Sequence, residues 1–200
     1  MSAELLQEIK KRNELEDDRE SCLHVLTWMA LRYTSHSISK GCLKGFLKDF
    51  DETYEVTGGV NGGMYKESSL LRRAIPKQVK FDRRPHLDNL IDELTKTFAI
   101  RYETKPSKEE FERFEEWEKK GKFGKNPSEE DSEELKLLFK KVLADLRVSI
   151  YRERTGSLKK RGWLVETFKR HLDAGSWPTS DKAKKQLTDD EHRAKRRRIE

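Results

Sequence analysis

Eight basic side chains crowd the stretch between residues 147 and 170, and the chemistry that such a group performs is the binding of phosphate. Residues 136–170 hold 11 Lys and Arg against three acidic residues, a balance of +8 in a chain whose total is +6. Basic side chains on a helical scaffold attract phosphates and release counterions, and the interleaved Tyr151 and Trp163 could stack on unpaired bases. The predicted nucleic-acid contacts are Arg147, Arg152, Arg154, Lys159, Lys160, Arg161, Lys169 and Arg170.

An acidic block directly precedes this basic stretch and offers a second interpretation. Residues 108–134 hold 11 acidic and six basic residues, a balance of −5. The basic side chains could therefore pair with Glu109–Glu118 within the fold, and Trp163 could belong to the core. Phosphate binding and internal neutralisation both remain open at this point.

A separate basic pattern ends the chain. Two lysines are followed, after nine residues, by four consecutive cations, which resembles a bipartite nuclear import signal. An extended basic strand can pair its charges with the acidic grooves of an import receptor without unfolding anything. We therefore expect a nuclear protein with an import receptor among its partners, the alternatives being a solvated, solubilising tail or a nonspecific phosphate binder. The residues concerned are Lys184, Lys185, Lys195, Arg196, Arg197 and Arg198.

Other chemistry lacks a recognisable pattern in the sequence. The five histidines are scattered, and no Ser or Cys stands in an arrangement typical of a nucleophile. Cys22 and Cys42 do not form a C-x-x-C pair, and Cys22 falls in an apolar helical run where we expect it to be buried. We therefore predict a non-catalytic protein with no cofactor and no metal site.

The elements that position these groups should be mostly helices. Apolar residues at i, i+3 and i+4 predict one long helix or two abutting ones over residues 3–34, and further helices over 39–54, 66–74, 87–98 and 133–172. The pattern Ser107-x-x-Glu110 predicts a capping box at the start of an acidic helix. We expect Thr155–Ser157 to break the 133–172 helix. The alternation of residues 98–104 allows a short strand, but one or two short strands would not make a sheet of consequence.

These elements predict a mainly α fold. We expect a single irregular helical bundle over residues 1–174, with a flexible Gly-rich loop or hairpin tip at 57–64. Residues 175–200 have few apolar side chains and should form a disordered basic tail whose root Trp177 could pin to the body. The sequence has no apolar run of the length that spans a membrane and no apolar stretch at its start that could act as a secretory signal, so we expect no membrane partner.

Two functions follow from these patterns. The first is a non-catalytic nuclear protein that binds DNA or RNA through the basic stretch, mostly by phosphate contacts. The second is a nuclear adaptor that holds protein partners through the acidic and aromatic helix at 107–118 or the apolar helix at 21–33.

Overall fold

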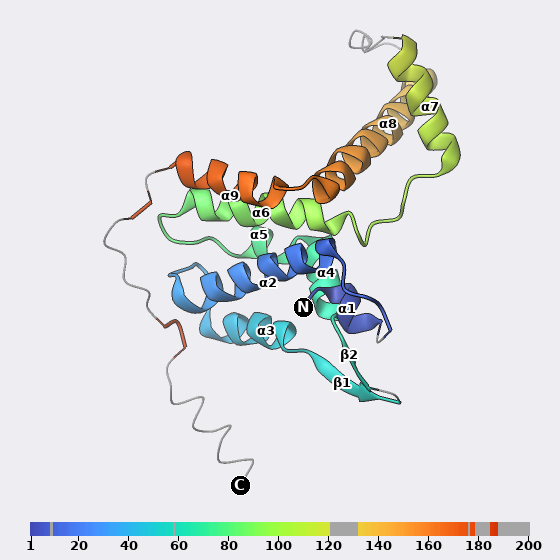
Figure 1. Ribbon diagram of the computed structural model, residues 1–200. Coiled ribbons are helices and arrows are strands. Elements are labelled where there is room, and N and C mark those ends of the chain that lie inside the picture. The colour runs from blue at the N-terminus through green and yellow to red at the C-terminus, as the bar shows by residue number, and fades with distance from the viewer. Residues whose placement is uncertain (9, 58, 121–131, 176, 179–184, 188–200) are drawn as a thin grey trace.

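The computed structural model describes residues 1–8, 10–57, 59–120, 132–175, 177–178 and 185–187. These residues form nine helices and one two-stranded hairpin, so the prediction of a mainly helical protein is confirmed (Figure 1). The elements are α1 (Ala3–Gln7), α2 (Leu15–Tyr33), α3 (Lys40–Phe50), β1 (Thr53–Val56), β2 (Gly59–Gly62), α4 (Met64–Arg72), α5 (Ala74–Gln78), α6 (Pro85–Ala99), α7 (Lys108–Lys120), α8 (Ser132–Lys159) and α9 (Trp163–Asp173).

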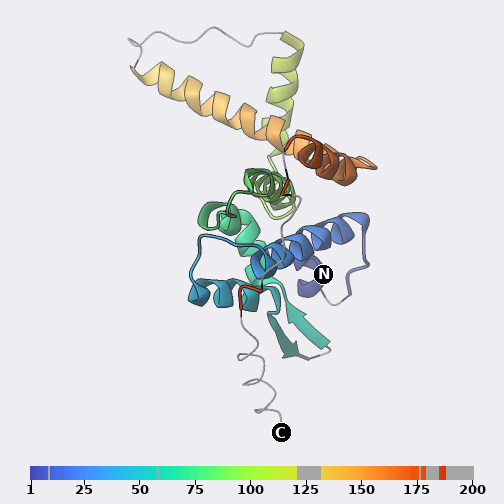
Figure 2. The ribbon, with the colours of Figure 1, turned by 90° about the vertical axis from the view of Figure 1, so that its left-hand side faces the viewer.

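Helix α6 is the central element of the body. It lies between the layer of α2, α4 and α5 on one side and α9 on the other (Figures 1 and 2). Pro85 occupies its first turn, where the missing N–H of proline has no helical partner to lose. Leu94 and Phe98 are fully buried, and the helix ends at Ala99 in a turn. The short strand that the sequence allowed over 98–104 does not form, because its first residues are the apolar end of this core helix.

The predicted 3–34 helix is two helices that do not abut, since residues 8–14 separate α1 from α2. Helix α2 packs against α3 and α6 with one face only, which buries Leu23 and Leu31. Its other face is exposed, and Val25 and Met29 keep 61% and 47% of their area in contact with solvent. Cys22 lies on that exposed side. The prediction that Cys22 is buried is therefore wrong.

The Gly-rich segment belongs to a β-hairpin, which is one of the two alternatives that the sequence left open. Strands β1 and β2 pair antiparallel, with Thr53 opposite Gly62 and Val56 opposite Gly59. Gly62 must be a glycine, because a Cβ there would lie 2.4 Å from the Glu52 carbonyl oxygen. The hairpin projects from the body below α3 and α4 (Figure 1).

Helices α7 and α8 form an arm that extends from the body (Figures 1 and 2). The predicted capping box starts α7: the Glu110 N–H donates to Ser107 Oγ at 3.3 Å, and the Ser107 N–H donates to the Glu110 carboxylate at 2.6 Å. Helix α8 continues through Gly156 to Lys159, and the Lys160 N–H still donates to the Gly156 carbonyl at 3.0 Å. The predicted break at Thr155–Ser157 is therefore wrong.

A buried cluster of charges joins α1 and α2 to the segment after α6. Asp17 and Glu20 have no exposed area. The Arg101 guanidinium donates to Asp17 at 2.6 Å and to Glu20 at 2.5 Å, and also to Glu4. Burial alone raises the pKa of Asp17, but the hydrogen bonds from Arg101 and Lys11 outweigh it and hold that pKa well below its ordinary value. The carboxylate of Asp17 is therefore ionised inside the protein.

Neutral groups complete this cluster. Ser2 Oγ donates to Asp17 at 2.8 Å, and the Ala3 N–H donates to Glu20 at 2.8 Å. The Tyr102 hydroxyl also donates to Glu20, and burial together with the charge of Glu20 raises the pKa of Tyr102, so it keeps its proton. The first turn of α1 is thus fixed to α2 by hydrogen bonds to buried carboxylates.

The root of the C-terminal tail packs on the body. The Trp177 indole N–H donates to the His171 carbonyl at 3.3 Å, and a Cβ at Gly175 would lie 2.0 Å from the His86 ring, so a larger residue there would have to displace that ring. Further on, the Gln186 N–H donates to the Arg32 carbonyl at 2.9 Å. The predicted pinning by Trp177 is confirmed. The predicted disorder concerns residues that mostly lie outside the described ranges, at 179–184 and 188–200.

Replacing Arg101 with Met should lower the free energy of unfolding by about 3–5 kcal/mol, because Glu20 would stay buried without its cation and Asp17 would keep only Lys11. Chemical denaturation followed by circular dichroism measures this. The matched control is Arg154→Met, since that side chain is 25% exposed and its guanidinium lies 3.9 Å from Glu103. The control should change stability by less than about 1 kcal/mol. Equal losses in the two variants would contradict a structural role for the buried cluster.

Replacing Gly156 with Ala should raise the free energy of unfolding by about 0.5–1 kcal/mol, because Ala loses less backbone entropy inside a helix. A Cβ at this position has no atom within 4 Å to clash with. Thermal melting is a sufficient measurement. Gly62→Ala serves as the contrasting variant and should destabilise the protein. A lower melting temperature for Gly156→Ala would mean that the helix is interrupted there after all.

Candidate nucleic-acid interface

A three-residue turn, Lys160–Gly162, joins α8 to α9 and carries part of the predicted basic surface. Gly162 adopts the left-handed conformation, with φ at +90°, which residues with side chains rarely adopt. Lys159, Lys160 and Arg161 are all exposed at this point. The local geometry therefore places three consecutive cations on the outside of a sharp bend.

Arg19 of α2 fixes this turn from below. Its side chain is buried, and its guanidinium donates to the Leu158 carbonyl and, at 3.1 Å, to the Lys160 carbonyl. The last carbonyls of a helix have no partner within the helix, and a cation at that end also complements the helix dipole. Arg19 supplies both the hydrogen-bond donors and the positive charge, so the backbone that carries the exposed cations is held to the body.

Five of the eight predicted phosphate contacts form ion pairs within the protein. Two of these pairs are with α7, as the alternative interpretation expected, and two others join the basic stretch to α6 or to the segment after it. The pairs are Arg147 with Glu110 at 3.5 Å, Arg152 with Glu115 at 2.6 Å, Arg154 with Glu103 at 3.9 Å, Lys160 with Glu166 at 2.7 Å, and Arg170 with Glu93. Much of the local positive charge is therefore neutralised.

The other three predicted contacts have no ion-pair partner among the residues that the structure describes. Lys159 is the last residue of α8, Arg161 lies within the turn, and Lys169 lies on the solvent side of α9. On the same side of α9, Val165 is 72% exposed. We call Lys159, Arg161 and Lys169 the turn cations.

The aromatic residues near the turn are not free to stack on bases. Trp163 is buried, with its ring edge-on to Phe98 at 5.8 Å between centroids. Tyr151 is half-buried against Phe111 at 6.0 Å. These contacts place Trp163 in the core, as the alternative interpretation held.

The aromatic side of the 107–118 helix is covered by α8. The Arg152 guanidinium lies over the rings of Phe111 and Phe114, at 5.6 and 5.2 Å from their centroids. Phe114 is buried. The side chain of Trp117 lies outside the described residues. The described aromatic side chains of this helix are thus already occupied within the arm.

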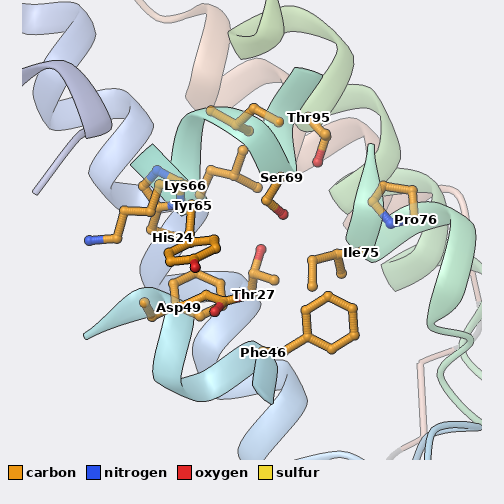
Figure 3. Close-up of a pocket in the computed structure, with 13 residues that line it drawn as sticks. His24, Thr27, Phe46, Asp49, Tyr65, Lys66, Ser69, Ile75, Pro76 and Thr95 are labelled. Carbon is orange, nitrogen blue, oxygen red and sulfur yellow. The ribbon is translucent and has the colours of Figure 1, made fainter. Parts of the chain in front are cut away.

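A small cavity lies on the other side of the body, between α2, α3, α4, α5 and α6 (Figure 3). The hydroxyls of Thr27, Ser69 and Thr95 face its interior, and His24 and Phe46 form part of its wall. Burial lowers the pKa of His24 although Glu20 lies 3.1 Å from its Nε2 atom, which favours a neutral ring. The free space of about 30 Å³ holds only a few waters, so a larger ligand would have to displace side chains.

The import-like residues fall mostly outside the described part of the chain. Lys185 is described and exposed, one residue before the Gln186 contact with α2. Lys184 and the four cations Lys195, Arg196, Arg197 and Arg198 lie outside the described residues. Their prediction therefore rests on the sequence pattern.

Sequence reasoning missed Arg19 and the buried carboxylates, although a signal was present. Asp17, Glu20, Thr27 and Leu31 recur at helical spacing on one face of α2, the face that turns to the core. Charges at core-facing positions of a helix need partners elsewhere in the chain. The many charged residues around these positions are instead typical of a helix start that is exposed to solvent.

In comparisons with known proteins, no family model, no curated protein and no solved structure matches the chain. Within the described ranges, none of the helices has the length and apolar character needed to cross a membrane. The same residues hold no group of three or more His, Cys, Asp or Glu side chains placed to bind a metal ion.

Proposed function

We propose that the protein is a non-catalytic nuclear protein that binds DNA or RNA by phosphate contacts at the α8–α9 turn. The observation that carries this proposal is the group of turn cations, exposed and without an ion-pair partner among the described residues. Arg19 and Gly162 hold the backbone beneath two of them in one conformation. A fixed backbone lowers the entropy that each phosphate contact would otherwise cost.

The other cations of the predicted set take a different role in this proposal. Arg147 and Arg152 join the arm together through Glu110 and Glu115, and Arg170 joins α9 to α6 through Glu93. The Lys160 pair with Glu166 is the exception, because both side chains are 60% exposed and water screens their attraction. Lys160 can therefore exchange Glu166 for a phosphate at little cost. Such contacts carry charge but little sequence information.

Reversing the turn cations in the variant K159E/R161E/K169E should lower affinity for nucleic acid at least about tenfold. It should also reduce the slope of log K against log salt by about 2 to 3, since roughly one phosphate contact is lost for each cation. Fluorescence anisotropy with a labelled duplex and a labelled single strand, from about 50 to 200 mM salt, measures both quantities.

The matched control is K40E/K48E/K105E, which changes the net charge equally at exposed positions on α3 and before α7. This control should lose much less affinity than the turn variant. If both variants weaken binding alike, attraction to the overall charge accounts for the affinity. If the natural protein binds neither probe at the lowest salt, the nucleic-acid proposal is wrong.

We propose further that the tail directs nuclear import. Fusing residues Thr179–Glu200 to a cytosolic fluorescent reporter should concentrate the reporter in the nucleus, because the two basic clusters stand at the spacing of a bipartite signal. Replacing Lys195–Arg198 with alanines should return the reporter to the cytosol. A wild-type fusion that stays cytosolic would remove the nuclear part of the proposal.

A second candidate function is the nuclear adaptor. The exposed side of α2 supports it, because Val25 and Met29 present apolar area that a partner helix could cover. The covered aromatic face of α7 makes the 107–118 helix the weaker of the two predicted partner sites. The adaptor becomes the first choice if the protein fails to bind both nucleic-acid probes.

A further inference from the structure

The hairpin region carries a surface of the opposite charge from the α8–α9 turn. Between residues 49 and 57 the chain has four acidic side chains and no Lys or Arg. None of the four forms an ion pair within the described part of the protein. The buried Lys66 attracts Asp51 and Glu52 through space, without a salt bridge. The acidic residues are Asp49, Asp51, Glu52 and Glu55, and with Tyr54, Met64 and Tyr65 they make up what we call the hairpin face.

Apolar side chains are exposed beside these carboxylates. Tyr54, Met64 and Tyr65 keep 42%, 60% and 55% of their areas in solvent. The Tyr54 hydroxyl lies 3.8 Å from the Met64 sulfur, so a strand residue and the first residue of α4 meet on one surface. Aromatic and Met side chains gathered at an exposed surface are common at sites that bind other proteins.

The backbone of β1 offers a third feature. Within the part of the chain that the structure describes, strand β1 pairs only with β2, and its residues Thr53–Glu55 are exposed. Alternate residues of a strand turn their N–H and C=O groups to opposite edges, so half of the groups of β1 face away from β2. An unpaired strand edge is a template on which an extended peptide can add as a further strand.

The hairpin is attached firmly enough to serve as such a template. The Glu52 carboxylate accepts the Tyr65 N–H at 3.0 Å, which joins the start of β1 to the first turn of α4. Gly62 and Gly63 pack against Glu52 and α1, where a Cβ would lie within 2.6 Å of a backbone oxygen. The edge and the acidic side chains therefore keep a defined relation to each other.

We propose that the hairpin face binds an extended, Lys- and Arg-rich segment of a partner protein, which adds as a third strand to β1. The backbone of that segment would pair with the free edge, and its cations would meet Asp51 and Glu55. Neighbouring residues of a strand point to opposite faces, so the residues of the segment that alternate with these cations would lie on the Tyr54 side of the hairpin. A nucleic acid does not fit this surface, because four carboxylates repel phosphates.

The test uses the full chain and a fluorescein-labelled peptide of alternating Lys and Val residues, followed by fluorescence anisotropy. The variant D51K/E55K should weaken binding at least about tenfold, since both altered side chains are exposed and both contribute charge. The control E112K/E116K makes the same change of net charge on the exposed side of α7 and should bind like the natural protein. Equal weakening in both variants would overturn the assignment to the hairpin face.

A second arm tests the strand itself without changing the protein. The same peptide with N-methyl groups on alternate residues keeps every charge but cannot pair its backbone with β1. Its affinity should fall at least about tenfold. Unchanged affinity would reduce the contact to charge attraction and overturn strand addition. The variant Tyr54→Ser removes apolar contact and leaves every charge and the strand backbone in place, so it should also weaken peptide binding. Unchanged affinity would exclude Tyr54 from the contact.

A third arm identifies the occupant. If the peptide binds the full chain only after Lys195–Arg198 are changed to Glu, the chain's own tail occupies the hairpin face, and the proposal of an external partner is wrong. Equal affinity before and after that change supports the external partner. Peptide binding by the K159E/R161E/K169E variant should match the natural protein, so the outcome does not depend on nucleic-acid binding at the turn.

Discussion

The buried contact of Arg101 with Asp17 and Glu20 is the constraint on which the placement of the other elements depends. Buried charges are tolerated only when each has a partner. The segment after the C-terminal end of α6, the start of α2 and the start of α1 must therefore pack together for these charges to be paired. The same turn of α2 that supplies these carboxylates also supplies Arg19, which points to the end of α8. The conformation of the α8–α9 turn is thus linked to the buried cluster through one turn of one helix.

Charge is arranged differently along the chain and on the folded surface. The acidic and basic blocks are neighbours in sequence, and the fold uses several of their charges in pairs within the arm and against α6. Among the described residues, three cations without an ion pair lie at or near the turn, and four carboxylates without one lie at the hairpin. A single net charge therefore describes this protein poorly, since two surfaces of opposite sign can select different ligands.

Local patterns predicted local structure well. Pro85 and the Ser107 capping box were identified from sequence because each acts through backbone groups only a few residues away. The break at Gly156 was predicted wrongly, since one glycine weakens a helix by only about 1 kcal/mol and the surrounding helix overrides it. Cys22 shows the same limit, because nothing in a run of apolar residues says which face meets the core. Of the candidate site, the sequence identified the cations but not which of them are paired, since their partners lie up to 77 residues away.

The position of the tail root determines how long a bound polymer would have to be to reach from the α8–α9 turn to the tail. Trp163 packs against Phe98 at one end of α6, and Trp177 lies beside His86 at the other. Fifteen residues of helix separate these ends by about 22 Å. At 3.4 Å per base step, a duplex would need about six or seven base pairs to pass from the turn to the root of the tail. If the protein binds nucleic acid as proposed, an oligonucleotide shorter than that could not reach from the turn to the root of the tail.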